Sequence, residues 1–240
     1  MKTLILAVIP ARGGSKGIPR KNLQEIKKRT LVSWAITTAN SVSDISHSAV
    51  STDSDEIAQE SFRSGVTSVV KRPEMLSGDT VLDQPVLRHA MLEIESKSQI
   101  QFDFVIMLQP TSPIRKKEDI ENAIRLIKEK KYDSIWSISQ EELHHHPQKQ
   151  LKIDENGLMD TFLGGKLQIR RQDLQNTYIR NGSFYIFTRD TVLNDNNLKG
   201  NSCFGYITRH KYINIDTIQE LEILRKQASV LDGRLILEDE

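Results

Sequence analysis

The chain has 240 residues, 38% of them hydrophobic, which suits one large α/β domain and requires no second one. Its 33 Lys and Arg residues nearly cancel its 32 Asp and Glu residues, which excludes the bulk basic charge that duplex nucleic-acid binding favours. A single cysteine excludes an intramolecular disulfide framework, and no apolar run is long enough to span a membrane, so we expect a soluble cytoplasmic protein with neither nucleic-acid nor membrane partners.

Short apolar runs alternate with helical patterns along the first part of the chain. Each of four β-rich runs is followed by a segment with helical periodicity. These pairs lie at residues 4–9 and 31–42, 48–52 and 55–65, 66–70 and 82–96, and 103–109 and 117–131. Such a βαβ series predicts a mainly parallel sheet with helices on both faces, and ligands bind beyond the carboxyl ends of such strands.

The segment IPARGGSKGIPRKN, residues 9–22, follows directly from the first apolar run. It matches neither the Walker A pattern nor G-x-G-x-x-G. Its glycines nevertheless allow backbone N–H groups to turn inward, and Arg12, Lys16, Arg20 and Lys21 can reach a triphosphate. Charge alone fits a solvated basic turn equally well, but the position of the loop after the first strand favours phosphate binding.

Polar residues also follow two later strands. Asp53 and Asp55 of STDSDEIA precede a predicted helix, so the leading interpretation is that their carboxylates satisfy free N–H groups at its N-terminus. Gln109 comes directly after the apolar FVIML, where placing a polar side chain costs free energy unless the side chain makes a functional contact. We therefore predict a functional role for Gln109 at this edge of the sheet, close to Thr111 and Ser112.

The pattern changes after about residue 141. The stretch from there to about residue 175 contains short extended segments around DENG, which predict an inserted β-hairpin with its turn at Asn156–Gly157. The chain then returns to apolar runs at 183–188 and 205–209 and ends in an amphipathic helix over 217–231.

Two conspicuous features predict no chemistry. The run HHH, His144 to His146, could suggest a metal cluster, but adjacent side chains on an extended segment point alternately away, and no carboxylate or cysteine has the spacing of a ligand. We expect a surface loop there. Cys203 has no catalytic partner nearby in the sequence and is expected to be an ordinary packed residue.

Several motifs along the chain together resemble one enzyme family. In order they are IPARGGSKGIPRKN, STDSDEIA, KRPEMLSGDT, LQPTSPIR, HPQK, RRQDL and IRNGSFYI. This order is similar to that of the acylneuraminate cytidylyltransferases, or CMP-sialic acid synthetases, a group that includes the CMP-legionaminate and CMP-pseudaminate synthetases. The resemblance implies a single α/β domain over residues 1–240, with a Rossmann-like nucleotidyltransferase fold and a β-rich dimerisation insertion at about 141–175.

The resemblance also implies the reaction. The anomeric hydroxyl of a nonulosonic acid attacks the α-phosphate of CTP and pyrophosphate leaves, with Mg²⁺ as the cofactor and a homodimer as the assembly. Nucleotide contacts are expected from Arg12, Gly14, Ser15, Lys16, Lys21, Asn22, Arg72 and Thr80. Of these, Arg12, Lys16 and Lys21 are expected to be catalytic, because phosphoryl transfer depends mostly on positioning and charge neutralisation.

Cytosine recognition departs from the pattern of the family. Arg72 of KRPEML matches the base-contacting arginine of the family, the alternative being a surface charge at the end of a strand. Asp83 stands where the family often has a serine for the base, with Thr80 nearby.

The acceptor residues follow from the same resemblance. Lys149 of HPQK and Arg171 of RRQDL match the residues that bind the sugar carboxylate, a task suited to an ammonium or a guanidinium. Gln109 and Thr111 are expected to bind sugar hydroxyls. Asn181 and Tyr185 are expected to line the same pocket, although a core strand aromatic is the better interpretation of Tyr185.

The segment YINIDT, residues 212–217, resembles a strand on which Asn214 and Asp216 share a side. The family has two aspartates at this spacing, one of them a metal ligand, so we expect Asp216 to be catalytic and to bind Mg²⁺, with the Asn214 carbonyl as a second ligand. The alternative is that Asp216 caps the helix that begins near TIQELEIL.

Two questions about function stay open at this stage. The acceptor could be N-acetylneuraminate, legionaminate or pseudaminate, because the residues that read the far end of the sugar are not identifiable. A catalytically silent nucleotide-binding protein of the same fold is a remote alternative. The complete set of loop cations, together with Gln109, Arg171 and Asp216, argues against it.

Overall fold

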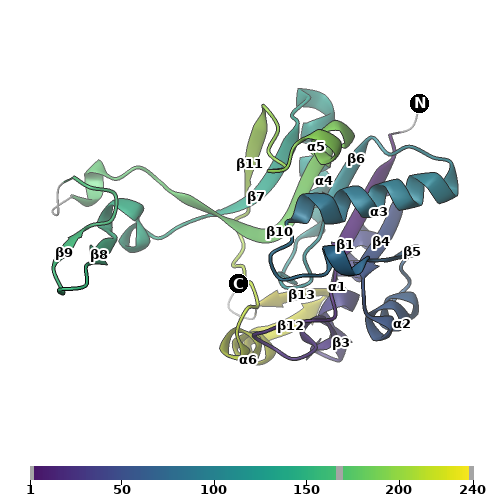
Figure 1. Ribbon diagram of the computed structural model, residues 1–240, viewed down its shortest axis with the longest axis horizontal. Coiled ribbons are helices and arrows are strands. Elements are labelled where there is room, and N and C mark those ends of the chain that lie inside the picture. The colour runs from purple at the N-terminus through teal and green to yellow at the C-terminus, as the bar shows by residue number, and fades with distance from the viewer. Residues whose placement is uncertain (1–2, 166–169, 238–240) are drawn as a thin grey trace.

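A seven-stranded sheet with the order β11-β7-β10-β6-β1-β4-β5 organises the molecule (Figure 1). The computed structural model describes residues 3–165 and 170–237. The strands of the sheet are β1 (Ile5–Pro10), β4 (His47–Thr52), β5 (Ser68–Lys71), β6 (Phe104–Met107), β7 (Ser134–Gln140), β10 (Tyr178–Thr188) and β11 (Cys203–Ile207). All neighbouring strands run parallel except β10, which is antiparallel to both β6 and β7. The prediction of a mainly parallel sheet is confirmed.

Helices cover both faces of the sheet, as the alternating pattern predicts. They are α1 (Leu31–Ser41), α2 (Asp55–Arg63), α3 (Asp83–Ser98), α4 (Lys117–Lys130), α5 (Arg189–Asn194) and α6 (Ile218–Gln227). Ile5 and Ile9 of β1 pack with α1, α2 and α4, whereas Leu6 and Val8 pack with α3 and α5. Successive residues of a strand face opposite sides, so an apolar strand serves two cores. None of the described helices is long and apolar enough to cross a membrane.

The elements β2 (Glu25–Ile26), β3 (Arg29–Thr30), β12 (Ala228–Leu231) and β13 (Arg234–Leu237) form two small hairpins beside the sheet. The predicted last helix was too long, because the chain leaves α6 at Gln227 and enters β12. Asp232 and Gly233 both have positive φ and turn the chain back, which lets Leu235 pack into a third core with α6. The burial of apolar side chains in this hairpin stabilises the fold more than the helical propensity of residues 228–231 would.

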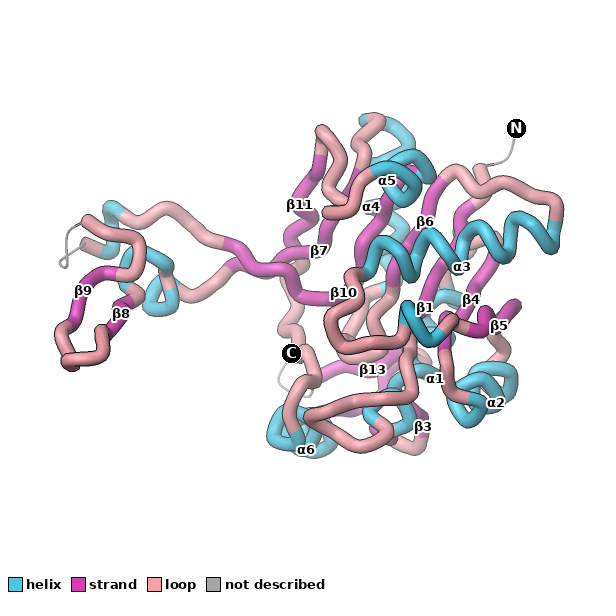
Figure 2. Tube along the Cα trace, viewed as in Figure 1, coloured by secondary structure: helices cyan, strands magenta, loops and turns pink. Residues whose placement is uncertain are grey.

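An arm formed by the described residues 141–165 and 170–177 leaves the body between β7 and β10 (Figures 1 and 2). It contains the hairpin of β8 (Leu151–Ile153) and β9 (Met159–Thr161), as predicted. The connection is longer than a two-residue turn, because β8 ends at Ile153 and β9 begins at Met159. Within it, the Asp154 carboxylate accepts from the N–H groups of Asn156 and Leu158. Short 3₁₀ helices lie at Lys21–Leu23, Glu74–Leu76, Leu143–His145, Pro147–Lys149 and Arg171–Asp173.

Strand β7 is an element that the apolar patterns do not predict, because serines interrupt its sequence, SIWSISQ. Its three serines are buried; Ser137 and Ser139 belong to a polar network around Asn181, whereas Ser134 Oγ donates to the Lys199 carbonyl. The Asn181 carbonyl accepts from Ser137 Oγ (2.7 Å), and its amide donates to Ser139 Oγ (2.9 Å) and Thr208 Oγ1 (2.7 Å). The network joins β7, β10 and the end of β11 where β10 bulges between Arg180 and Tyr185.

Removing the amide at the centre of this network should destabilise the fold. Asn181→Ala deprives three buried hydroxyls of one hydrogen-bond partner each, which should lower the free energy of unfolding by about 1–3 kcal/mol. Denaturant unfolding measures the change. As a control, Asn194→Ala at the exposed end of α5 should change stability by less than about 0.5 kcal/mol. Equal effects of the two substitutions would show that the network does not hold these strands.

Candidate active site

A cleft of about 260 Å³ opens at the carboxyl ends of β1 and β6. It lies where the parallel part of the sheet predicts a ligand site. Eight of the residues predicted to contact substrates line this cleft: Arg12, Gly14, Ser15, Lys21, Asn22, Arg72, Gln109 and Thr111. The structure therefore brings together side chains from the opening loop and from the ends of two later strands.

The opening loop is held by two contacts at its start. The Gly13 N–H donates to the Asp53 carboxylate at 2.7 Å, and the Asn22 amide donates to the Arg12 carbonyl at 2.9 Å. Asp53 therefore fixes the loop instead of filling the predicted role at the N-terminus of α2. Ser54 caps that helix, and Asp55 lies in its first turn as expected.

Two loop cations meet a carboxylate that the sequence patterns do not single out. Asp79 forms ion pairs with Arg12 and, at 2.8 Å, with Lys16. Lys16 and Arg12 hold the pKa of the Asp79 carboxyl below its usual value. The Lys16 side chain is 84% exposed and does not line the cleft, and neither does the exposed Thr80. Lys16 thus lies outside the cleft in this arrangement.

Lys21 joins the loop to the segment that contains Asn214 and Asp216. Its ammonium donates to the Ile215 carbonyl at 2.9 Å and to Asp216 Oδ1 at 3.1 Å. The Asn214 amide donates to Asp216 Oδ2 at 2.6 Å, and its carbonyl accepts from Ser112 Oγ at 3.1 Å. The predicted pairing of Asn214 and Asp216 is confirmed, but the predicted strand is wrong, because residues 211–216 form no ladder.

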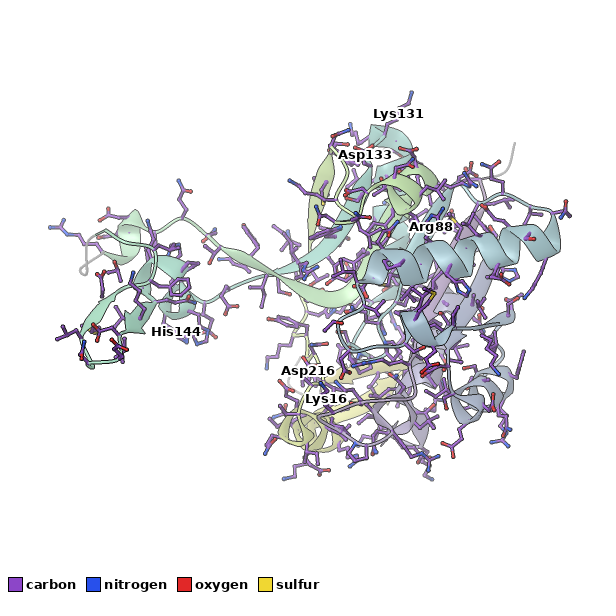
Figure 3. The ribbon with its side chains drawn as sticks, viewed as in Figure 1. Lys16, Arg88, Lys131, Asp133, His144 and Asp216 are labelled. Atoms are coloured by element: carbon purple, nitrogen blue, oxygen red, sulfur yellow. The ribbon has the colours of Figure 1, made fainter. Side chains whose placement is uncertain are left out.

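The alternative role of Asp216 as a helix cap is also wrong. Thr217 is the N-cap of α6, and it forms a capping box with Glu220. The Asp216 side chain is 64% exposed and lies close to the opening loop (Figure 3). Asp216 is therefore available for chemistry at the edge of the cleft.

Close packing explains one glycine of the opening loop. A Cβ atom on Gly17 would lie 2.5 Å from the Asp216 carbonyl oxygen, whereas one on Gly14 would meet nothing within 4 Å. Gly17 is thus required by the approach of two backbones, whereas Gly14 lines the cleft at an open position.

Arg72 is buried, so the alternative of a surface charge is wrong. The side chain is 6% exposed, and it donates from Nε to Ser51 Oγ (3.2 Å) and from Nη2 to the Ser51 carbonyl (2.7 Å). Burial lowers the pKa of its guanidinium, and the nearby Asp53 opposes that shift. These contacts fix the guanidinium in the wall of the cleft.

Gln109 is positioned by its neighbours on β10. Gly182 has φ +73°, and a Cβ there would lie 2.9 Å from Gln109 Oε1. Arg115 donates to the carbonyls of Gln109 and Ser183, and so ties β6 to the bulge of β10. Burial lowers the pKa of Arg115 to about 9. Arg115 ends the motif LQPTSPIR, but the sequence assigned it no role, because its partners are backbone atoms of distant segments.

Asn181 and Tyr185 are not in the cleft, so their predicted place there is corrected. The amide of Asn181 is 1% exposed and is occupied by the network described above. Tyr185 is a buried strand aromatic whose hydroxyl accepts from the Gly182 N–H at 3.0 Å. It packs edge-on to Trp136 and lines a second cavity of about 280 Å³, which shares Val81 and Asp83 with the cleft.

Lys149 and Arg171 belong to the short 3₁₀ helices Pro147–Lys149 and Arg171–Asp173 of the arm, which projects from the body (Figure 1), and neither is among the residues that line the cleft. His144 and His145, also in the arm, lie 3.0 Å from Glu142 and Glu141 respectively (Figure 3). The described residues contain no group of three His, Cys, Asp or Glu side chains that could hold a metal ion.

Cys203 lies on the edge strand β11, where it is partly buried. Burial raises the pKa of its thiol, as expected for an ordinary packed residue.

A family model for cytidylyltransferases matches residues 6–229. The chain belongs to the cytidylyltransferase family. It is 29% identical over 221 residues to a pseudaminic acid cytidylyltransferase of Campylobacter jejuni, with 92% of this chain and 94% of that protein covered. It is 35% identical over 193 residues to a CMP-N,N'-diacetyllegionaminic acid synthase of Legionella pneumophila, with 79% and 80% covered.

The fold of this cytidylyltransferase is also that of a solved structure. A CMP:2-keto-3-deoxy-manno-octonic acid synthetase complexed with CTP superposes with a TM-score of 0.67 at 17% identity, and the match covers 93% of this chain and 98% of that one. The nucleotidyltransferase fold predicted from the motifs is confirmed, and the protein is a nucleotidyltransferase enzyme.

The cleft of this cytidylyltransferase should depend on close packing at Gly17. Gly17→Ala forces the loop away from Asp216, so we expect a lower melting temperature and at least a tenfold loss of turnover, since misplaced catalytic groups are costly. Gly14→Ala, at an open position, should leave the melting temperature unchanged. Thermal unfolding and turnover of both variants provide the test, and a Gly17→Ala protein that matches wild type in both would contradict it.

Proposed function

We propose that this cytidylyltransferase transfers the cytidylyl group of CTP to the anomeric hydroxyl of a nonulosonic acid and releases pyrophosphate. One observation carries the proposal: a glycine-rich cationic loop, the buried Arg72 and the polar end of β6 converge on a single cleft. The named relatives act on pseudaminic acid and on diacetyllegionaminic acid, which supports an acceptor of this class.

The loop meets the main electrostatic demand of this transfer. Phosphoryl transfer needs cations and fixed donors where negative charge develops, rather than a nucleophilic side chain. Arg12, Lys21 and the backbone at Gly14 and Ser15 line the cleft and supply them. Arg12 and Lys16 pair with Asp79, so a triphosphate would compete with that carboxylate for both cations.

The residues around Asp216 fit a magnesium ion shared with the nucleotide. Mg²⁺ in such sites uses one or two carboxylates together with substrate phosphates, and Asp216 offers one carboxylate beside the loop. Asn214 turns its amide N–H₂ toward Asp216, so its carbonyl could bind the ion only if the amide group rotated. After that rotation, Ser112 Oγ could accept a hydrogen bond from the amide N–H₂ of Asn214. When bound, Mg²⁺ would neutralise charge on the phosphates.

We assign the contacts to the acceptor sugar to two parts of the protein, the cleft and the arm. Gln109 and Thr111 lie in the cleft and can bind sugar hydroxyls. Lys149 and Arg171 would bind the carboxylate, but they lie on the arm, so we propose that the arm reaches the cleft of a second copy in a homodimer.

The surface of the arm supports this assembly. Its exposed apolar side chains are Leu151, Ile153, Leu158, Met159, Phe162 and Leu163, with Ile153 71% exposed. A group of this kind on a projecting element suits an interface between subunits.

Pyrophosphate release with CTP and Mg²⁺ tests the reaction. The acceptors should include N-acetylneuraminate, legionaminate and pseudaminate, and the assay should be repeated with ATP, GTP and UTP. We expect release with CTP and at least one of these sugars, and none without an acceptor. Lys21→Ala provides the inactive control. Binding of CTP without turnover on any nonulosonic acid would favour a catalytically silent nucleotide-binding protein.

The role of Asp216 in binding Mg²⁺ can be separated from any role in stability. Asp216→Asn should lower activity by more than the roughly 10–100-fold typical of outer residues of a metal site, and should raise the Mg²⁺ concentration required. The Asp216 carboxylate is mostly exposed, so its pair with the partly buried Lys21 should contribute only about 0–1 kcal/mol; Thr217 still caps α6, so the free energy of unfolding should change little. Asn214→Asp is the matched variant and should be tolerated. An unchanged Mg²⁺ titration in Asp216→Asn would contradict this assignment.

Subunit mixing tests whether Lys149 acts across a dimer. Lys149→Ala and Lys21→Ala should each be nearly inactive as homodimers, because one lacks the cation of the arm and the other a cation of the cleft. After exchange, the heterodimer contains one site with both lysines, so activity should return. Heterodimers verified by differential tags but still inactive would place Lys149 in the site of its own chain or outside the site.

A further inference from the structure

Arg115 is a buried cation that the proposed reaction does not use directly. Its side chain is 3% exposed, and no carboxylate among the described residues pairs with it. Burial is therefore the main influence on its guanidinium, and it lowers the pKa. Burying a charge that lacks a counter-charge costs free energy, so the position calls for a role that needs the whole guanidinium group.

The guanidinium bridges two backbone carbonyls on neighbouring strands. Nη2 donates to the Gln109 carbonyl just beyond the end of β6, and Nε donates to the Ser183 carbonyl in the bulge of β10. Nη1 has no hydrogen-bond partner among the described residues. The planar fork of an arginine serves two acceptors at fixed positions, a geometry that the ammonium of a lysine does not reproduce. Arg115 thus holds these two strand ends together.

The turn that Arg115 holds carries the residues proposed for the acceptor. The Ser112 N–H also donates to the Gln109 carbonyl, at 3.1 Å, so residues 109–112 turn around the atom that Arg115 binds. Gln109 and Thr111 of this turn line the cleft, whereas Arg115 does not. Arg115 instead lines a separate cavity of about 300 Å³, which shares no lining residue with the cleft. An effect of Arg115 on a substrate therefore has to pass through the turn.

The bulge on the other side of this bridge packs against the Gln109 side chain. Gly182, next to Ser183, has φ +73°, and a Cβ atom there would lie 2.9 Å from Gln109 Oε1. The Gly182 N–H donates to the Tyr185 hydroxyl at 3.0 Å, which fixes the backbone of the bulge. A shift of this backbone relative to β6 would open space beside Gln109 and allow its side chain other rotamers.

We infer that Arg115 is a positioning residue for the acceptor sugar: its guanidinium holds the turn at 109–112 against the bulge of β10 and so keeps the Gln109 amide directed at the sugar. This rests on the proposed function, which places the sugar beside Gln109. The nucleotide contacts proposed above lie on residues 12–22 and on Arg72, so a change at Arg115 should weaken the acceptor and spare CTP.

A double-mutant cycle tests this inference, with whichever of N-acetylneuraminate, legionaminate and pseudaminate gives turnover. Arg115→Lys keeps the charge but loses the fork, so the Michaelis constant of the sugar should rise about tenfold or more, while the dissociation constant of CTP with Mg²⁺, from calorimetry, should stay within about twofold. Gln109→Ala should raise the same Michaelis constant. Because Arg115 acts through Gln109, the double variant should resemble Gln109→Ala instead of showing the product of the two effects.

Chemical rescue provides a second measurement, which also serves if Arg115→Lys does not fold. In Arg115→Ala, methylguanidinium at a millimolar, non-denaturing concentration should lower the Michaelis constant of the sugar, because the cavity beside Arg115 can admit a small planar cation. Methylammonium carries the same charge without the fork and should not lower it. Equal recovery with both cations, or none with either, would contradict the role of the guanidinium fork.

Arg189→Lys is the matched control. Arg189 also donates from Nε and Nη2, both to the Glu95 carboxylate, and it does not line the cleft. It should keep the wild-type Michaelis constant even where its melting temperature falls. Additive effects of Arg115→Lys and Gln109→Ala overturn the inference, and so does a loss of CTP affinity as large as the loss for the sugar. Absence of turnover by wild type on all three sugars would instead contradict the proposed function, and the inference with it.

Discussion

The bonds of Lys21 to the Ile215 carbonyl and the Asp216 carboxylate join segments 194 and 195 residues apart in the chain, and the site depends on this connection. A glycine-rich loop has many accessible conformations, so it can present fixed donors only if other elements hold it. Asp53 holds one side through Gly13, and the segment around Asp216 holds the other through Lys21 and the close approach at Gly17. Catalysis by fixed charges requires this rigidity, since groups that must reorganise during the reaction stabilise a transition state poorly.

The βαβ part of the fold could be predicted because its signals are local and repeated. The strand LILAVI is apolar on both faces, and each crossover helix carries its own apolar stripe. Prediction failed where stability comes from distant partners. Strand β7 contains buried serines whose hydroxyls are satisfied by Asn181 on another strand, so its sequence does not resemble a core strand. The residues after Gln227 form a hairpin because a third core covers them, which helical periodicity cannot anticipate.

The same distinction applies to the site. The opening loop carries its chemistry within fourteen consecutive positions, 9–22, and most of its predicted residues line the cleft. Asp53, Asp79 and Arg115 act on that loop or on Gln109 from other segments; all three stand in the motifs STDSDEIA, KRPEMLSGDT and LQPTSPIR, but a motif does not specify which distant partner each residue meets. Asn181 and Tyr185 stand beside a bulge near the cleft, but the bulge directs them into the protein, which a motif does not specify.

The proposed function divides the contacts to the two substrates between two parts of the molecule. Residues 12–22 and 72–86 all belong to the body, so under that proposal one chain alone supplies the contacts to the nucleotide. The cations proposed for the sugar carboxylate lie on the arm, which projects away from the body (Figure 2). Under the proposed assembly, nucleotide affinity is a property of the subunit, whereas acceptor affinity is a property of the dimer. Changes on the arm can then alter the acceptor without disturbing the loop contacts of Asp53 and Asp216, and this arrangement allows related enzymes to combine one nucleotide with different sugar acids.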